Sequence, residues 1–267
     1  MKFPPILLII AIAFVILPTS VTKTAEPAKP ILVDVQRIWD KAPHNAFTDL
    51  IRHKDLWYCV FREGSGHVSP DGSLRVITSV DGKQWASKAL ISSATHDLRD
   101  AKITVTPQGK LLLNGAGMIA DAKIRYQSMS WLSSNDGATW DNGYIIGHPG
   151  FWLWRVQWHN NLAYTFGYST ERDRTTRRLR LYTSQTGSQF DTHVQQLTAP
   201  AGCGEDAILF LKDGTALCLL RHETGTKMAQ LGRSVAPYTK WVWQDLNLRI
   251  GGPNMLQLSD GRIIAVT

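Results

Sequence analysis

The chain has 267 residues, of which 43% are hydrophobic and 19% are charged, so it can bury a core and is too apolar to be intrinsically disordered. Its 29 basic and 22 acidic side chains give a net charge of +7, but the one dense basic cluster, within residues 172–180, includes an acidic side chain and is predicted to be a solvated hairpin. The composition therefore does not indicate a nucleic-acid-binding protein. Cys59, Cys203 and Cys218 lack metal-ligand spacing, so no metal and no cofactor are predicted, and at most Cys203 could form a disulfide with Cys218.

The N-terminal segment is typical of a secretory signal peptide. Lys2 precedes an apolar run over residues 6–17, which is shorter than the roughly 20 residues that span a bilayer. We therefore predict a signal peptide over residues 1–25 and a mature domain over residues 26–267. The protein is expected to be secreted or periplasmic, with no stable membrane span after the signal is removed.

Short apolar segments recur about every 50 residues after this leader. They are Trp57–Arg62, Leu111–Asn114, Leu162–Phe166, Ala216–Arg221 and Ile263–Val266. Most follow a tight-turn sequence such as Asp213-Gly214 or Asp260-Gly261, as the second strand of a β-hairpin does. A period of this length with several short strands per unit predicts an all-β fold of the β-propeller type.

A second motif runs in phase with the first and has the pattern S-x-D-G-x-x-W. It occurs over Ser79–Trp85 and Ser134–Trp140, with a degenerate copy over Ser184–Phe190. The Asp can accept backbone N–H bonds across a turn, the Gly allows positive φ, and the Trp can pack against the hairpin base. We therefore predict that these turns stabilise the outer part of each blade rather than take part in catalysis.

The repeat count predicts an incomplete propeller. A mature chain of roughly 240 residues holds about four and a half units of 50 residues, and the fifth unit stops inside its second strand at Thr267. The sequence is therefore expected to be truncated at the C-terminus. An open sheet edge of this kind favours aggregation.

The first strand of each blade lines the centre of a propeller, so polar residues near its start are candidate substrate ligands. They are Asp49, Arg99 with Asp100, Arg155, Glu205 with Asp206, and Asn254. The ends of two second strands add Arg62 and Arg221. These side chains are predicted to meet at one mouth of the propeller.

Together these features resemble the sialidase (neuraminidase) superfamily, over essentially all of the mature chain. Phe61-Arg62 matches the first half of the family's Phe/Tyr-Arg-Ile-Pro motif, and Glu205 precedes Arg221 by 16 residues, the spacing of the family's Glu and second arginine. The resemblance implies a propeller of six blades that removes terminal sialic or related acidic sugars from glycans. It also implies that Arg62 and Arg221 bind the sugar carboxylate, which suits a guanidinium fork, and that Glu205 polarises a nucleophilic Tyr.

Two parts of the family pattern are altered. The segment Gly64–Gly72 stands where the family's acid/base Asp is expected, and His67 lies nearest that place. Asp71 fits a turn better than a catalytic role, so Asp100 is the alternative acid. The third arginine and the nucleophilic Tyr of the family would both fall after Thr267.

Two other functions stay open. A propeller glycosidase could use Asp49, Asp100 and Glu205 directly on neutral glycosides, whereas a noncatalytic glycan-binding propeller would bind sugar without turnover. The indoles of Trp152 and Trp154 could provide a sugar-stacking surface or pack between blades. All three functions share a glycan as the partner molecule.

Overall fold

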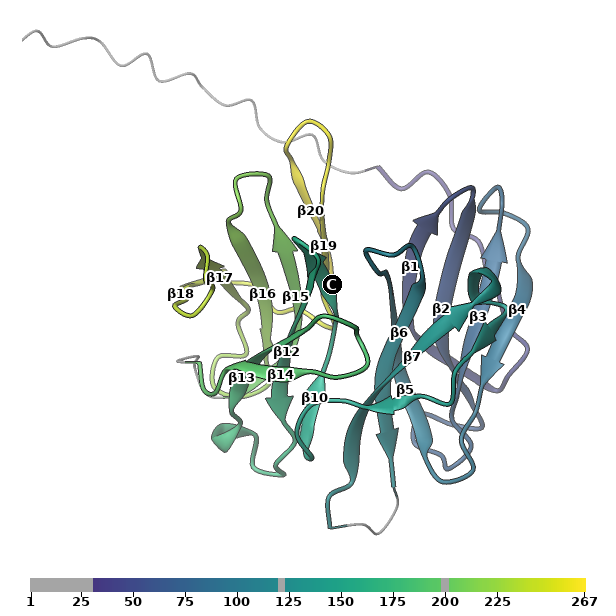
Figure 1. The fold of residues 1–267 in the computed structure, drawn as a ribbon, viewed down its shortest axis with the longest axis horizontal. Coiled ribbons are helices and arrows are strands. Elements are labelled where there is room, and N and C mark those ends of the chain that lie inside the picture. Colours follow the sequence, from purple (N-terminus) through teal and green to yellow (C-terminus); the bar gives the residue numbers. More distant parts are fainter. Residues whose placement is uncertain (1–30, 120–122, 198–201) are drawn as a thin grey trace, which may run out of the picture. The chain divides into compact units, whose positions relative to one another are not determined.

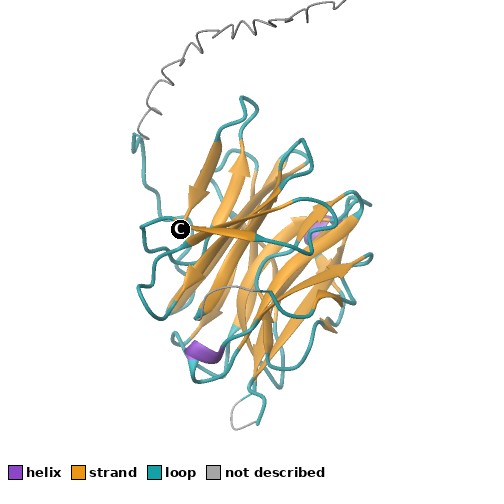
Figure 2. Ribbon diagram, turned by 90° about the vertical axis from the view of Figure 1, so that its left-hand side faces the viewer, coloured by secondary structure: helices purple, strands orange, loops and turns teal. Residues whose placement is uncertain are grey.

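The computed structural model describes residues 31–119, 123–197 and 202–267. The predicted signal peptide lies outside these ranges. Residues 37–267 form one compact unit, and its described part consists of strands, loops and two single-turn 3-10 helices (Figure 2). No helix in the described ranges is long and apolar enough to cross a membrane.

Four antiparallel sheets follow one another along the chain, as predicted for propeller blades. Blade one contains β1 (His44–His53), β2 (Leu56–Gly64), β3 (Ser73–Ser79) and β4 (Ala86–Ile91). Blade two contains β5 (Asp97–Val105), β6 (Leu111–Met118), β7 (Tyr126–Ser134), β8 (Thr139–Trp140) and β9 (Tyr144–Ile145), with a 3-10 turn at Asn135–Gly137. Blade three contains β10 (Phe151–Leu153), β11 (Gln157–His159), β12 (Leu162–Ser169), β13 (Leu179–Ser184) and β14 (Asp191–Val194), with a 3-10 turn at Arg174–Thr176.

Blade four and a final hairpin complete the described chain. Blade four contains β15 (Cys203–Phe210), β16 (Ala216–His222), β17 (Gln230–Ser234) and β18 (Val242–Asp245), and the hairpin contains β19 (Asn254–Gln257) and β20 (Ile263–Val266). The sheets stand side by side in chain order (Figure 1). The propeller fold is therefore confirmed, and the predicted second strands are β2, β6, β12, β16 and β20.

The core lies between neighbouring blades. One cluster joins blades one and two through residues such as Val60, Leu74 and Leu113, and another joins blades three and four through residues such as Phe166 and Cys218. All eight residues of β6 are buried, because its sheet is covered on both faces. This double coverage explains why the second strands are continuous apolar runs rather than alternating ones.

The first of the three predicted turns forms as expected. The Asp81 carboxylate accepts hydrogen bonds from the backbone N–H groups of Lys83 and Gln84, both at 2.8 Å. The Trp85 indole donates to the Gly82 carbonyl at 3.0 Å, and Gly82 has a φ of 73°. The hydrogen bonds to the carboxylate lower the pKa of Asp81 to about 2.

The other two turns have different polar partners, and in the second turn Asn135 and Asp136 both have a φ of 50°. Asp136 forms an ion pair with Lys54 at 2.6 Å, while the Trp140 indole donates to its turn as Trp85 does. In the degenerate copy the Thr186 hydroxyl replaces the carboxylate and accepts the backbone N–H of Ser188 at 3.2 Å. A hydroxyl can thus substitute for the Asp because the turn needs only a short-range acceptor.

The cysteines form no disulfide: all three are buried free thiols. The possible bridge between Cys203 and Cys218 is excluded by register, because Cys203 lies opposite His222 whereas Cys218 lies opposite Ile208. Burial raises the pKa of Cys203 to about 12. These thiols are therefore part of the core.

Candidate functional site

The innermost strands of three blades carry a β-bulge at the same level. The register shifts between Ala46 and Asp49 in β1, between Arg99 and Lys102 in β5, and between Cys203 and Asp206 in β15. In each case two residues of the inner strand oppose one residue of the second strand. The single second-strand residues that face the bulges are Phe61 in β2, Gly115 in β6 and Arg221 in β16. Bulges redirect side chains and are common beside active sites, so these three bulges mark a candidate site.

The bulge in β5 contains Asp100, which is buried. Asp100 is the first bulge residue and has a φ of 54°, in the left-handed region. The opposed residue must be Gly115, because an added Cβ would lie 2.6 Å from the Arg99 carbonyl oxygen. Burial raises the pKa of Asp100, and the charge of Glu205 acts in the same direction, whereas Lys102 and Arg99 oppose them.

The bulge in β15 places Glu205 against Arg221. The two side chains form an ion pair, with Glu205 17% exposed and Arg221 31% exposed. Arg221 also lies 3.3 Å from Glu223, which in turn pairs with Arg177 from the β12–β13 loop. A chain of alternating charges therefore connects Glu205 to the neighbouring blade.

A buried charged cluster lies beneath these bulges. Arg155 donates to the Asp49 carboxylate at 2.8 Å, and the same oxygen accepts the Ile103 backbone N–H at 2.9 Å. The pKa of Lys102 is lowered by burial, while Asp100 acts in the opposite direction. Asp206 is 0% exposed, and neither carboxylate oxygen has a hydrogen-bond partner among the described residues. Burial therefore raises its pKa well above the ordinary value.

Tyr168 and the indoles of Trp152 and Trp154 pack together in blade three. Tyr168 stacks on Trp152 with ring centroids 6.3 Å apart, and the Arg177 guanidinium lies 5.0 Å from its ring centre. Burial raises the pKa of Tyr168 well above its ordinary value, and the charges of Glu205 and Asp100 add to the effect. Trp152 and Trp154 are 8% and 5% exposed, so they pack between blades and do not present an open stacking face.

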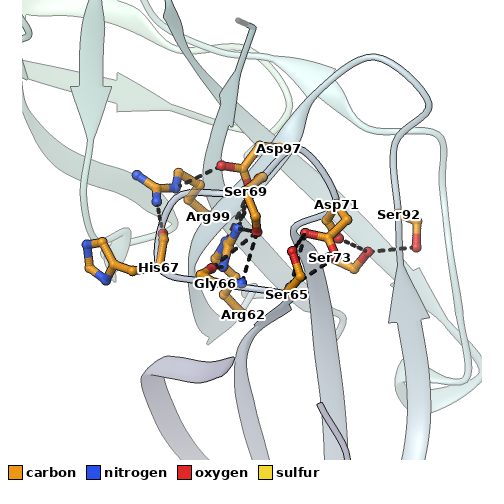
Figure 3. Close-up of polar contacts among 10 residues, drawn as sticks. All are labelled: Arg62, Ser65, Gly66, His67, Ser69, Asp71, Ser73, Ser92, Asp97 and Arg99. Carbon is orange, nitrogen blue, oxygen red and sulfur yellow. Dashed lines mark hydrogen bonds and ion pairs between the residues drawn. The ribbon is translucent and has the colours of Figure 1, made fainter. Parts of the chain in front are cut away.

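Arg62 is enclosed by protein acceptors. Its side chain is 0% exposed, and it donates to Asp97 at 2.8 and 3.1 Å, to the Gly66 carbonyl at 2.6 Å and to the Ser69 hydroxyl at 2.9 Å. Figure 3 shows the β2–β3 loop wrapped around this guanidinium. Asp97 also lies 3.2 Å from Arg99, so one buried carboxylate holds two arginines.

The two other candidates in the β2–β3 loop differ in their surroundings. The Asp71 carboxylate accepts the backbone N–H and the hydroxyl of Ser65, at 3.0 Å each, as the predicted turn requires. These hydrogen bonds and one from Ser69 lower the pKa of Asp71 to about 2. The His67 carbonyl accepts a hydrogen bond from Arg99, whereas its imidazole is exposed and points away from the Arg62 guanidinium (Figure 3).

The structure thus brings some predicted residues together and separates others. Asp49, Asp100, Arg155, Glu205 and Arg221 contribute to one network of charges around the mouth. A second, adjoining group contains Arg62, Arg99 and His67, joined by Asp97 and by backbone carbonyl groups. Asn254 lies in β19 and accepts the backbone N–H of Met255.

Arg62 and Arg221 both lie near the end of an apolar second strand, but the register shows that these two positions are not equivalent. Arg62 pairs with Ala46, the residue before the bulge in blade one, whereas Arg221 opposes the bulge in blade four. The equivalent of Arg62 in blade four is His222, which pairs with Cys203. Successive residues of a strand point to opposite faces, so the two arginines face different environments.

The arginine-rich segment after β12 is a hairpin loop, as predicted, but only part of it is solvated. The side chains of Arg174 and Arg178 are 54% and 46% exposed, whereas that of Arg177 is 11% exposed. Arg180 is buried with its guanidinium 4.1 Å from the centre of the Phe151 ring. Arg177 and Arg180 therefore pack against aromatic rings of their own blade.

Three residues of the site were not singled out from the sequence: Lys102, Tyr168 and Asp97. Lys102 follows Arg99 by three positions on the same inner strand, and Tyr168 is the penultimate residue of the second strand of blade three. Their positions in the repeat could have identified them. Asp97 gives no comparable signal, because its role depends on contact with the neighbouring blade.

Two pockets in the described part of the chain are lined by residues other than those at the bulges. One of about 520 Å³ is lined by β16–β18 residues, including Leu217, Leu231 and Val242. Another, of about 290 Å³, lies beside Lys41, Glu63 and other residues of blade one. Neither contains the clustered carboxyl groups, so we place the candidate site at the bulges on chemical grounds.

No protein-family model matches the chain, and no curated protein matches its sequence. Solved structures share its fold. A protein of unknown function from Dyadobacter fermentans superposes with a TM-score of 0.75 at 16% identity, covering 85% of this chain and 76% of that one. An α-L-arabinanase from Penicillium chrysogenum, complexed with arabinobiose, gives 0.66 at 14% identity, covering 84% and 75%.

An exo-β-1,3-galactanase from Phanerochaete chrysosporium, with β-1,3-galactotriose, gives a TM-score of 0.56 at 10% identity, covering 74% of this chain and 49% of that one. These similarities show a common propeller fold. The arabinanase and the galactanase are glycoside hydrolases, and neither is a sialidase. The resemblance to sialidases therefore stays a prediction.

Proposed function

We propose that the protein is a glycoside hydrolase that acts on neutral sugars, with Asp100 and Glu205 as the reacting carboxyl groups. The observation that carries this proposal is their placement on equivalent bulges of two inner strands, one carboxyl group buried and the other ion-paired. Glycoside hydrolysis commonly needs two carboxyl groups in unlike environments.

Asp100 is suited to the role of general acid. Its buried position favours the protonated form, and none of the described residues donates a hydrogen bond to its carboxylate. A protonated carboxyl group can give its proton to the glycosidic oxygen as the bond to the leaving group breaks. Because its pKa is raised, this proton is retained to a higher pH than in an ordinary Asp.

Glu205 is suited to the complementary role. Its carboxylate is partly exposed and pairs with Arg221. It can accept a proton from the attacking water, or it can attack the anomeric carbon and form a covalent intermediate that water later hydrolyses. The anomeric configuration of the first product distinguishes these two routes.

A neutral sugar fits the arginines better than an acidic one. Arg62 is buried with its donors directed to Asp97, Gly66 and Ser69, and Arg155 is held by Asp49. A sialic acid carboxylate would need guanidinium donors that face the substrate. The arabinanase and galactanase that share the fold are named with neutral oligosaccharides, which supports the same choice.

The test compares leaving groups in single variants. Hydrolysis of 4-nitrophenyl and 2,4-dinitrophenyl arabinosides and galactosides is measured for the unaltered protein, Asp100→Asn and Glu205→Gln. Asp100→Asn should lose about 10²–10⁴-fold on the 4-nitrophenyl substrates and much less on the dinitrophenyl ones, because a good leaving group needs no proton. Glu205→Gln should lose activity on both.

Asp213→Asn is the matched control, since Asp213 only accepts the Thr215 backbone N–H in an exposed turn. Equal activity of all three variants would refute the assignment. Sugar binding by the unaltered protein with no hydrolysis of any substrate would instead indicate a glycan-binding propeller.

A further inference from the structure

Phe47 adopts an unusual backbone conformation beside the candidate site. It is the first bulge residue of β1, the position that Asp100 occupies in β5, and its φ of 63° lies in the left-handed region, as does the 54° of Asp100. A bulky side chain rarely adopts this conformation, and such strain concentrates at functional positions. The shared geometry directs Phe47 in blade one as Asp100 is directed in blade two.

Two imidazoles pack around the Phe47 ring. The centroid of His67 lies 5.3 Å from that of Phe47 and the centroid of His44 lies 6.4 Å from it, with interplanar angles of 67° and 65°. The two imidazoles are 5.6 Å apart at 79°. No pair stacks face to face, and each of the three residues is at least partly exposed, although the His44 Nε2 atom is buried. We call these three residues the aromatic triad.

The backbone under the aromatic triad is held by buried arginines. Arg62 donates to the Gly66 carbonyl at 2.6 Å, and Arg99 donates to the His67 carbonyl. The Asp97 carboxylate forms an ion pair with each of these two arginines and so holds them in place. The His67 ring is therefore positioned before any ligand arrives, which lowers the entropic cost of binding.

The aromatic triad is linked to the strand of Asp100 through Arg99, which donates to the His67 carbonyl. Burial lowers the pKa of His44, and the charges of Arg62, His67 and Arg99 lower it further. Arg99 directly precedes Asp100 in β5. An aromatic surface on blade one thus adjoins the strand that carries the proposed acid, on a different blade from Glu205.

We propose that the aromatic triad is a stacking site for the sugar ring on the leaving-group side of the scissile bond. This inference rests on the proposed hydrolase function and adds a subsite to it. The general acid contacts the leaving-group oxygen, so a surface beside Asp100 and away from Glu205 faces the departing sugar. Neutral sugars present an apolar C–H face, and its burial against aromatic rings is favourable. Trp152 and Trp154 are too buried to serve in this way.

The experiment measures binding in the Glu205→Gln background, so its result does not depend on turnover. The probes are arabinobiose and β-1,3-galactotriose, titrated by calorimetry. Adding Phe47→Leu, which keeps an apolar side chain but removes the ring, should weaken binding of at least one probe by about tenfold or more, whereas Phe47→Trp should retain it. Tyr144→Leu, which removes a ring that is 42% exposed on the outer strand β9, is the control and should change nothing.

Thermal unfolding of each variant checks that the fold is unchanged, and Phe47→Trp provides a second reading if Phe47→Leu is destabilised. Equal affinity with and without the Phe47 ring, or no binding of either probe to Glu205→Gln, would overturn the proposal. Failure of the hydrolase assignment is distinguishable: the unaltered protein would then hydrolyse no substrate while oligosaccharide binding still depended on Phe47.

Discussion

Replacing Arg62 by Met tests whether this arginine holds the fold or binds the substrate. The substitution removes the guanidinium from a fully buried site and leaves the Asp97 carboxylate, 2% exposed, with only Arg99 at 3.2 Å. Removing one partner of a buried ion pair costs about 3–5 kcal/mol. The carbonyl of Gly66 and the hydroxyl of Ser69 also lose their donor, so we expect the upper part of this range.

The loss should be visible in thermal unfolding, followed by the fluorescence of the 10 tryptophans. For a unit of this size, a cost of about 3–5 kcal/mol corresponds to a decrease in Tm of about 6–20 °C. Arg262→Met is the matched control, because Arg262 and Asp260 form an exposed pair, 63% and 49% exposed, in a turn. Exposed pairs contribute at most about 1 kcal/mol.

A double-mutant cycle separates the pair from its surroundings. Arg62→Met with Asp97→Asn removes both charges, so the double variant should be more stable than the sum of the single effects implies, with a coupling of about 0.5–3 kcal/mol. A loss of less than about 1 kcal/mol in Arg62→Met, together with loss of substrate binding, would refute this reasoning. Arg62 would then be a substrate ligand, as the sialidase resemblance implies.

Three further outcomes follow from the buried and hydrogen-bonded carboxyl groups. The folded-state pKa of Asp206 is raised above 3.8, so the free energy of unfolding of the unaltered protein should fall as the pH rises above this value. In urea unfolding from pH 4 to 8, Asp206→Asn should make this free energy depend less on pH and should increase it by about 1–3 kcal/mol at pH 8. The pKa of Asp81 is lowered to about 2, so Asp81→Ala should lower Tm at pH 6 and have no effect below pH 2. Glu223→Gln weakens the ion pairs with Arg177 and Arg221. We expect kcat on neutral glycosides to fall about tenfold, or about 1.4 kcal/mol, with little change in KM. The pH–rate profile should also change.

The second strands were predictable because they are buried on both sides. A continuous apolar run such as Leu111–Leu113 needs no knowledge of its neighbours, since a propeller covers both faces of a blade. The turns at Asp81 and Asp71 were equally predictable, because their hydrogen bonds connect residues close in sequence. Local chemistry thus determines the parts of the fold that sequence analysis identified.

The bulges were not predictable, and they decide the site. A bulge is a relation between two strands, and the inner strand alone does not reveal its extra residue. Without it, Arg62 and Arg221 appear to be equivalent strand-end arginines, whereas their partners are Ala46 in one blade and the bulge with Glu205 in the other. The contact of Asp97 with Arg62 crosses 35 residues and two blades, so no local pattern indicates it.

The most direct test of the proposed activity is the release of sugar from natural-type oligosaccharides. The unaltered protein is incubated with arabinobiose, β-1,3-galactotriose and a sialylated trisaccharide, and the released monosaccharides are measured by chromatography. We expect arabinose or galactose to appear, at a rate that Asp100→Asn and Glu205→Gln reduce strongly, and no sialic acid. Release of sialic acid alone would contradict the proposal and would favour the family that the sequence resembles.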